Sequence, residues 1–300
     1  MTLQQLHYAI VISESGSMNK AAEILYIAQP SLTSAIKELE KETSITIFNR
    51  SGKGVTLTAD GVEFISYARQ VYQQYEILQE RYTHNIKKKF GVSAQHYSFA
   101  VQAFVEMVKQ FNTCDYEFAI RETKTSEVID DVVTMKSEIG ILYLSDFNRQ
   151  MMNRIFQMQS LEFHVLIDCG IYAYLSKEHP LAKKESVTFE ELNEYPCLTF
   201  EQGDKSSFYF AEEIFSTNDY ARVIKACDRS TMLNLMKGLN GYTFCSGIIC
   251  DDLNGSDYTA IPIANDNSIM EIGYITKKNV ILSEMGNIYI KELQNYLANN

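Results

Sequence analysis

A short run of amide and hydroxyl side chains near the N-terminus has the composition of a surface that reads DNA. The run is "QPSLTSAIK", and its polar members are Gln29, Ser31, Thr33, Ser34 and Lys37. Gln can pair with adenine, small hydroxyl side chains let a helix enter the major groove, and Lys can contact phosphate. The alternative is that Ser and Thr near a helix start only cap the helix. The four amide and hydroxyl side chains of Gln29, Ser31, Thr33 and Ser34 together favour a DNA contact.

The surrounding sequence predicts the helices that would present this run. Ser17 is the expected N-cap of one short helix, and a tight turn follows it. Pro30 then falls at the first position of the next helix, where its missing N–H costs nothing. Leu32, Ile36 and Leu39 recur at helical spacing and face inward, which leaves the polar residues outside. Two short helices joined by a tight turn form a helix-turn-helix.

The stretch "ITIFNRSGKGVTLT", residues 45–58, predicts a β-hairpin beside this motif. Two β-prone runs flank the turn sequence 51–54, and Arg50 and Lys53 lie near its tip. We read the hairpin as a wing that touches phosphate. The candidate DNA contacts are therefore Lys20, Gln29, Pro30, Ser31, Thr33, Ser34, Lys37, Arg50 and Lys53.

A long amphipathic helix is predicted from Thr58 to about residue 87. Apolar side chains recur every three or four positions, at Val62, Ile65, Ala68, Tyr72, Tyr75, Leu78 and Tyr82. We expect the small N-terminal unit to leave this stripe uncovered, so that a second copy of the chain pairs with it. The run Lys87-Lys88-Lys89 is expected to mark an exposed hinge.

After residue 90, short apolar strands alternate with amphipathic helices, which predicts mostly parallel α/β sheets. A second block of this kind begins near residue 163 and contains a capping box formed by Thr188 and Glu191. The final strand and helix, over about 271–298, are expected to return to the first block. The pattern therefore predicts two α/β lobes.

Composition narrows the class of protein. The 300 residues are 46% hydrophobic and carry a net charge of −11, which argues against a nonspecific nucleic-acid binder. Residues 1–89 hold 10 Lys and Arg against 9 Asp and Glu, so the excess of acid lies in the C-terminal part. No secretory signal or membrane span is recognised, and a cytoplasmic location is expected. The six cysteines show no metal-binding or disulfide spacing, and no metal or cofactor is expected.

The whole chain resembles the LysR-type transcriptional regulators. The segments "GSMNKAAEIL", "AQPSLTSAIKELE", "IFNR" and "LTADG" occur in the order and spacing of that family, and "YAYLSKEHPLA" and "STMLNLMKGLNG" agree more loosely. Asn240 departs from the family pattern, in which Gly is common at that position. Asn tolerates the left-handed conformation that such a position requires.

The resemblance implies a complete domain plan. A winged helix-turn-helix is expected over 1–58, a dimerising linker helix over 59–89, and a two-lobed α/β effector domain over 90–300 that is similar to periplasmic solute-binding proteins. Lobe I would hold about 90–162 and 266–300, and lobe II about 163–265. The implied function is sequence-specific binding of double-stranded promoter DNA by a homodimer or homotetramer, controlled by a small-molecule effector and without enzymatic activity.

The expected effector site lies between the lobes. Ser93, Gln95 and His96 follow the first strand, where free backbone N–H groups would favour a carboxylate or another small anion. The alternative is that Ser93 caps the helix and His96 lies on the surface. Tyr143 and Ser145 end another strand and could reach the same cleft. The resemblance implies a contribution from the opposing lobe, in the loop after its strand, at Thr199, Phe200, Glu201 and Gln202. An acid at Glu201 would favour a cationic or neutral polar ligand instead.

Three other functions stay open at this point. A solute-binding protein or an enzyme could carry a non-functional helix-turn-helix, although the chain lacks G-x-S-x-G, H-E-x-x-H and a dinucleotide glycine motif. A thiol-based redox-sensing regulator is the third, because one branch of the family senses peroxide through effector-domain cysteines. Cys197 would be the sensor, but a buried inert thiol is the stronger interpretation since no cationic neighbour lowers its pKa.

Overall fold

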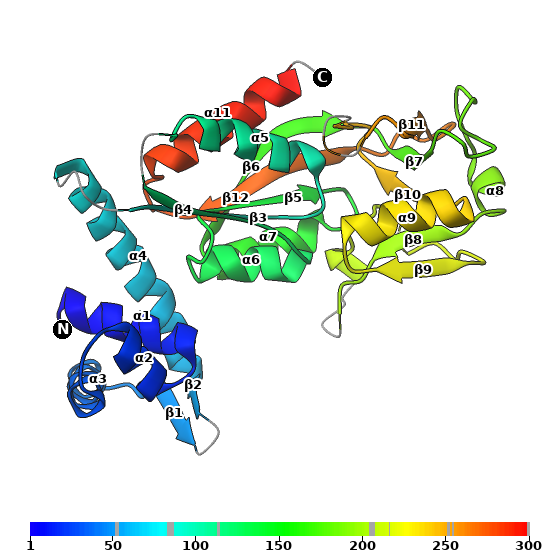
Figure 1. Cartoon of the computed structure of the whole chain (residues 1–300). Helices are drawn as coiled ribbons and strands as arrows, with labels where there is room; N and C mark the ends of the chain where they lie inside the picture. Colours follow the sequence, from blue (N-terminus) through cyan, green and yellow to red (C-terminus); the bar gives the residue numbers. More distant parts are fainter. Residues whose placement is uncertain are drawn as a thin grey trace. The chain divides into compact units, whose positions relative to one another are not determined.

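The computed structural model describes residues 1–51, 54–82, 87–112, 115–203, 208–215, 217–250, 253 and 255–298. The chain forms two compact units, Met1–Ile86 and Lys87–Asn300. Figure 1 follows the chain through both units from blue to red. None of the described helices combines the length and hydropathy needed to cross a lipid bilayer.

The N-terminal unit is helical and carries one hairpin. Its elements are α1 (Leu3–Ser15), α2 (Met18–Ile24), α3 (Gln29–Thr43), β1 (Phe48–Ser51), β2 (Gly54–Leu57) and α4 (Ala59–Tyr82). Ser17 caps α2 by accepting from the backbone N–H of Lys20, as predicted. Pro30, expected at the first position of its helix, is the second residue of α3, which begins at Gln29. Leu32 and Ile36 are fully buried in the core. The predicted helix-turn-helix and hairpin are both present.

The apolar stripe of α4 is divided between the core and the surface. Ile65 is 2% exposed in the core of the unit, and Ala68 packs with Leu6 of α1. The expectation that this unit leaves the whole stripe uncovered is therefore wrong, because α1 covers its first half. Two members of the stripe, Val62 and Leu78, remain exposed, as do Tyr67 and Val71 outside it.

The first lobe of the second unit is a five-stranded sheet covered on both faces. Its elements are β3 (Lys88–Ala94), α5 (Ser98–Lys109), β4 (Tyr116–Glu122), α6 (Thr125–Val133), β5 (Ile139–Leu144), α7 (Arg149–Met158), β6 (Leu161–Cys169), β12 (Met270–Lys277) and α11 (Glu284–Ala298). The strand order is β4-β3-β5-β12-β6. Helices α5 and α11 lie on one face and α6 and α7 on the other (Figure 1).

Strand β12 changes two of the expected features of this lobe. It runs antiparallel to both β5 and β6, so the sheet is mixed rather than mostly parallel. It also pairs with β6 from Leu161 to Cys169, and this pairing keeps β6 in lobe I. The crossing into lobe II therefore follows Cys169, and the boundary expected near residue 163 is wrong. The return of the last strand and helix to lobe I is confirmed.

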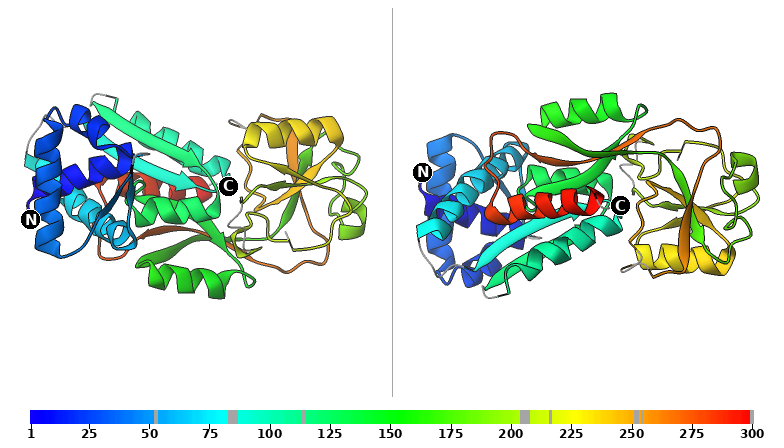
Figure 2. Two further views of the ribbon diagram at one scale, coloured as in Figure 1. Left: turned by 90° about the horizontal axis from the view of Figure 1, so that it is seen from below. Right: turned by 90° about the horizontal axis from the view of Figure 1, so that it is seen from above.

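The second lobe has its own five-stranded sheet. Its elements are β7 (Tyr172–Ser176), α8 (Phe189–Leu192), β8 (Cys197–Phe200), η1 (Phe208–Phe210), β9 (Val223–Ala226), α9 (Arg229–Leu239), β10 (Tyr242–Cys245) and β11 (Tyr258–Pro262). The strand order is β11-β7-β10-β8-β9, and the predicted capping box of Thr188 and Glu191 begins α8. Figure 2 shows the two segments that join the lobes, one leaving β6 and one entering β12.

Asn240 ends α9 with its backbone in the left-handed region, at a φ of 49°. Substitutions at this position therefore test our account of how the helix ends. We predict that Asn240→Gly keeps or raises the free energy of unfolding, because Gly adopts this conformation without strain. Asn240→Val should lower it by about 1–2 kcal/mol, since a β-branched side chain clashes there. Urea denaturation of the two variants measures the difference. Equal stabilities would contradict this account of the helix end.

Candidate functional site

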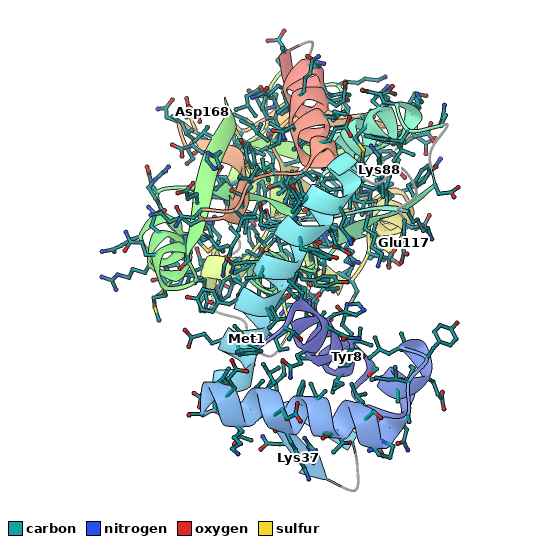
Figure 3. The ribbon with its side chains drawn as sticks, turned by 90° about the vertical axis from the view of Figure 1, so that its left-hand side faces the viewer. Met1, Tyr8, Lys37, Lys88, Glu117 and Asp168 are labelled. Atoms are coloured by element: carbon teal, nitrogen blue, oxygen red, sulfur yellow. The ribbon has the colours of Figure 1, made fainter. Side chains whose placement is uncertain are left out.

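The outer face of α3 is polar and free of large side chains. Gln29, Ser31, Ser34 and Lys37 are exposed, while Leu32 on the opposite side is fully buried. Figure 3 shows Lys37 on the side of α3 that points away from α1. The exposed polar face predicted for this helix is therefore present, and it can approach the floor of a groove.

The other predicted contact residues lie at the start of α3 and on α2. The amide nitrogen of Gln29 donates to Thr33 Oγ1 at 2.9 Å, which fixes the Gln29 side chain along the helix surface. Pro30 is exposed at the same end, and Lys20 is exposed on α2.

The hairpin is anchored to the helices through its backbone. Glu40 of α3 accepts hydrogen bonds from the backbone N–H groups of Ile47 and Phe48, at 2.8 and 3.1 Å. Val55 of β2 donates to the backbone oxygen of Gly16 at 2.9 Å. Arg50 of β1 is exposed and lies 3.6 Å from Glu40. Lys53, expected at the tip, lies outside the described residues.

Sequence reasoning missed Tyr26, which lies in the turn between α2 and α3. Its side chain is 95% exposed, and its backbone has a φ of 53°. An exposed aromatic in a strained left-handed turn is unusual for a purely structural residue. The available signal was a bulky residue in the four-residue connection 25–28 between the two helices of the motif.

The two lobes of the second unit are joined by a buried carboxylate on the segment 208–215. One oxygen of Glu212 lies 2.8 Å from Nδ1 of His96 and 3.2 Å from its backbone nitrogen, and His96 belongs to lobe I. The other oxygen accepts from Nε2 of Gln202 at 2.9 Å. A buried carboxylate is costly unless donors surround it, so these contacts hold the lobes together.

Other contacts cross between the lobes beside Glu212. Arg229 at the start of α9 forms an ion pair with Glu122 at the end of β4. The Tyr143 hydroxyl donates to the backbone oxygen of Ala211 at 3.0 Å. The backbone N–H of Thr125 in lobe I donates to Gln202 at 3.2 Å. The lobes are therefore tied at several points around one edge of the cleft.

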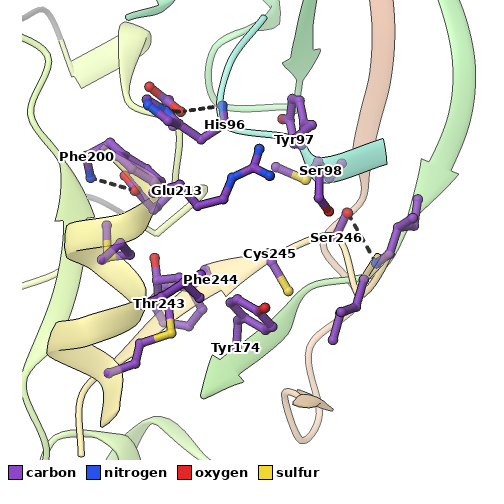
Figure 4. Close-up of a pocket in the computed structure, with 18 residues that line it drawn as sticks. His96, Tyr97, Ser98, Tyr174, Phe200, Glu213, Thr243, Phe244, Cys245 and Ser246 are labelled. Carbon is purple, nitrogen blue, oxygen red and sulfur yellow. Dashed lines mark hydrogen bonds and ion pairs between the residues drawn. The ribbon is translucent and has the colours of Figure 1, made fainter. Parts of the chain in front are cut away.

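A cavity opens between the lobes next to these contacts (Figure 4). Lobe I contributes His96, Tyr97, Ser98 and Met270. Lobe II contributes Tyr174, Phe200, Glu212, Glu213, Arg229, Met232, Leu233, Met236, Thr243, Phe244, Cys245, Ser246, Ile248 and Ile249. The His96 ring stacks on Phe200 with 3.7 Å between ring centroids. The lining is mainly apolar, with polar groups at a few points, which is typical of a small-molecule site.

Glu213 contributes an unusual carboxyl group to the cavity wall. It is 4% exposed and accepts a hydrogen bond from the backbone N–H of Phe200 at 2.8 Å. Burial, reinforced by the neighbouring carboxylate of Glu212, raises the pKa of Glu213 to about 8. Glu213 is therefore mainly protonated at neutral pH and can donate a hydrogen bond.

Two of the predicted effector-site residues line this cavity, namely His96 and Phe200. Ser93 and Gln95 do not, because their side chains are buried in the network of lobe I. Ser93 donates to Asp131 at 2.6 Å, and Gln95 bonds to Thr125 and to the backbone N–H of Tyr143. The expectation of a free backbone N–H group at Gln95 does not hold, because this group donates to the backbone oxygen of Ile141 at 3.0 Å. The side chains of both residues connect β3 with α6 and β5 instead of facing the cleft.

The remaining predicted residues lie around the cavity but not in its wall. Tyr143 and Gln202 form the contacts between the lobes described above. Glu201 is exposed and accepts from the Cys227 thiol at 3.2 Å. Ser145 is buried before α7, and Thr199 lies within β8 beside β9. The sequence missed Glu212, Glu213 and Thr243, because acids in "AEEIF" resemble a solvated segment.

The cysteines of the described ranges are free, and Cys197 is fully buried. Burial raises the pKa of the Cys197 thiol to about 12, and Glu213 adds to this effect. Because the thiolate is the reactive form, Cys197 is an inert side chain of the core. Cys114 lies outside the described residues. In the same ranges, no cluster of His, Cys, Asp and Glu could hold a metal ion.

The raised pKa of Glu213 predicts a pH-dependent stability. The folded state holds this proton more tightly than the unfolded chain, so the free energy of unfolding should fall by about 2 kcal/mol from pH 6 to pH 8. Glu213→Gln should remove this slope, because the amide mimics the protonated acid. Urea denaturation at both pH values tests it, with Glu185→Gln as the exposed control. Parallel slopes in wild type and Glu213→Gln would contradict the assignment.

Family models match both units of the chain. The model described as "Bacterial regulatory helix-turn-helix protein, lysR family" matches residues 3–62. The model described as "LysR substrate binding domain" matches residues 96–297, which is more than half of the chain. The helix-turn-helix and the cavity between the lobes thus lie in the two regions that these models cover.

Curated relatives agree with this assignment. HTH-type transcriptional regulator AlsR of Bacillus subtilis is 30% identical over 205 residues, which cover 66% of this chain and 64% of AlsR, slightly less than two thirds of its length. The uncharacterized HTH-type transcriptional regulator YbhD of Escherichia coli is 25% identical over 288 residues, which cover 94% of this chain and 87% of YbhD.

Solved structures share the fold. A full-length OxyR from Pseudomonas aeruginosa, in which one cysteine is changed to aspartate, has a TM-score of 0.71 at 18% identity, over 98% of each chain. A cysteine-to-serine mutant of OxyR from Corynebacterium glutamicum has a TM-score of 0.52 at 17% identity, over 99% of this chain and 93% of that one. The chain belongs to the LysR family of bacterial transcriptional regulators, with a DNA-binding helix-turn-helix and a two-lobed α/β effector-binding domain.

Proposed function

We propose that this regulator reads promoter DNA with the outer face of α3, pairs with further copies through α4, and responds to a small molecule held between its lobes. The observation that carries the proposal is the cavity, which is lined from both lobes beside the contacts that tie them together. A regulator of transcription acts where the DNA is, so we place the chain in the cytoplasm.

The proposed DNA contacts divide by their chemistry. Gln29, Ser31 and Ser34 reach base edges, because they occupy the exposed side of α3 near its start. Lys37 and Arg50 contact phosphates, which position the protein without reading sequence. Tyr26 adds a phenol hydroxyl beside them. Arg50 would exchange part of its attraction to Glu40 for a phosphate.

The proposed response to the effector follows from the position of the cavity. A ligand that touches Met270 of lobe I and Met236 of lobe II gains its full set of contacts only at one lobe separation. Binding therefore shifts the population toward that separation, by as much as the ligand prefers it. The neighbouring contact between Glu212 and His96 would strengthen or weaken with the same motion.

We propose that the effector is bound and released unchanged. The thiol that lines the cavity is Cys245, and burial raises its pKa to about 12. A thiol that stays protonated is a poor nucleophile. This supports a binding role for the cavity over a catalytic one.

DNA recognition can be tested with two substitutions on α3. Gln29→Ala should weaken binding to the preferred operator by about 1–3 kcal/mol and relax the preference at one base pair. Lys37→Ala should weaken binding to all sequences similarly and flatten the salt dependence. Titrations with operator and scrambled duplexes measure both, with Gln4→Ala on α1 as the control. An unchanged sequence preference in Gln29→Ala would exclude base reading by this residue.

Assembly can be tested on the exposed side of α4. Leu78 is 56% exposed, and Val71 lies two turns before it. Leu78→Lys and Val71→Lys should shift the chain toward smaller species, because a buried unpaired charge is costly in a helix pair. Sedimentation velocity at micromolar concentration gives the species present, and Met158→Lys on α7 serves as control. The proposal fails if both α4 variants sediment like the wild type.

A further inference from the structure

The charged side chains in the described wall of the cavity are already paired. Glu212 is bound by His96 and Gln202, and Arg229 by Glu122. The start of α9 is occupied as well, because Asp228 accepts from the backbone N–H of Thr231 at 2.8 Å. A ligand entering the cavity thus meets groups whose charges are compensated within the protein.

The uncharged part of the wall has one polar group without a partner. The hydroxyl oxygen of Thr243 is buried without a hydrogen bond to the described protein atoms, and the residue is 5% exposed. Thr243 lies on β10 in the cavity wall, on the same side as Glu213 in Figure 4. Buried hydroxyl groups normally have a partner, so a ligand atom is the natural one here.

Much of the rest of the wall is apolar. Met232, Met236, Ile248 and Met270 line the space with flexible thioether or branched aliphatic side chains. Methionine side chains adapt to irregular apolar shapes, and such a lining favours the transfer of an apolar body out of water.

We propose that the effector is an uncharged, largely apolar molecule with a carbonyl-type acceptor that receives a hydrogen bond from Thr243. This inference rests on the proposed role of the cavity as the effector site. Glu213 lies in the same cavity wall, and its raised pKa keeps it mainly protonated at neutral pH, so it adds a second donor group there. The Thr243 hydroxyl can donate to one lone pair of a ligand carbonyl.

A carboxylate ligand fits this wall poorly. Its charge would lie beside the carboxylate of Glu212 in a mainly apolar surrounding, and the cost of burying an unpaired anion is large. Arg229 already pairs with Glu122, so a carboxylate ligand there would be a second anion on one guanidinium group. An ester of the same acid has the same apolar part but no charge, so its burial avoids the cost of desolvating an anion.

The test compares matched pairs on the full chain at pH 7. The probes are the methyl esters and the free acids of benzoic, cinnamic and hexanoic acid, and calorimetric titration gives each affinity. We expect at least one ester to bind at least tenfold more tightly than its acid. Thr243→Val should lower the affinity for that ester about fivefold, which corresponds to the loss of one neutral hydrogen bond. The control variant Thr259→Val on β11 should bind the ester as tightly as the wild type.

The outcomes separate this inference from the proposed function. Tighter binding of an acid would overturn the ligand class and leave the cavity as the effector site. Ester binding that Thr243→Val does not change would overturn the role of the hydroxyl. If no probe of either kind bound at millimolar concentration, the ligand class and the effector role of the cavity would both fall, while DNA binding would remain testable on α3.

Discussion

The arrangement of the effector domain depends on one buried carboxylate, that of Glu212. Both of its oxygens receive donors, one from His96 in lobe I and one from Gln202 in lobe II. Removing either donor leaves part of a buried charge unsatisfied, so the spacing of the lobes is fixed by the need to keep all donors in place. The cavity exists at this spacing, with the stack of His96 on Phe200 as one wall.

The same constraint positions the hairpin of the DNA-binding unit. Glu40 accepts from two consecutive backbone N–H groups at the start of β1, so the hairpin cannot swing away from α3 without exposing or orphaning them. In both units, a carboxylate on one element collects donors from another. The exposed polar groups of α3 and the hydroxyl of Thr243 lie outside these networks. We assign the groups on α3 to DNA binding and the hydroxyl of Thr243 to effector binding.

Local signals in the sequence were sufficient for most elements. Pro30 in the first turn of α3, the Ser17 cap and the capping box at Thr188 depend on neighbours within a few residues, so the sequence predicts them directly. The left-handed Asn240 was predictable for the same reason. The helix-turn-helix and the division into two lobes follow from such local patterns taken in order.

Features that depend on distant partners were not predictable. The antiparallel pairing of β12 and the pairing of β6 beyond residue 163 depend on contacts between strands that lie more than a hundred residues apart in the sequence. Ser93 and Gln95 were expected in the cleft, because no local signal shows that Asp131 and Thr125 will occupy them. Glu212 was missed for the same reason, since its partner His96 lies in the other lobe and more than a hundred residues away in the sequence.

The claim that Glu212 and His96 tie the lobes together is tested most directly by a double-mutant cycle. The free energy of unfolding of the full chain is measured in urea for wild type, His96→Ala, Glu212→Ala and the double variant. The account predicts a coupling energy of about 2 kcal/mol between the two substitutions. Effects that add to within about 0.5 kcal/mol would contradict it, because independent residues behave in that way.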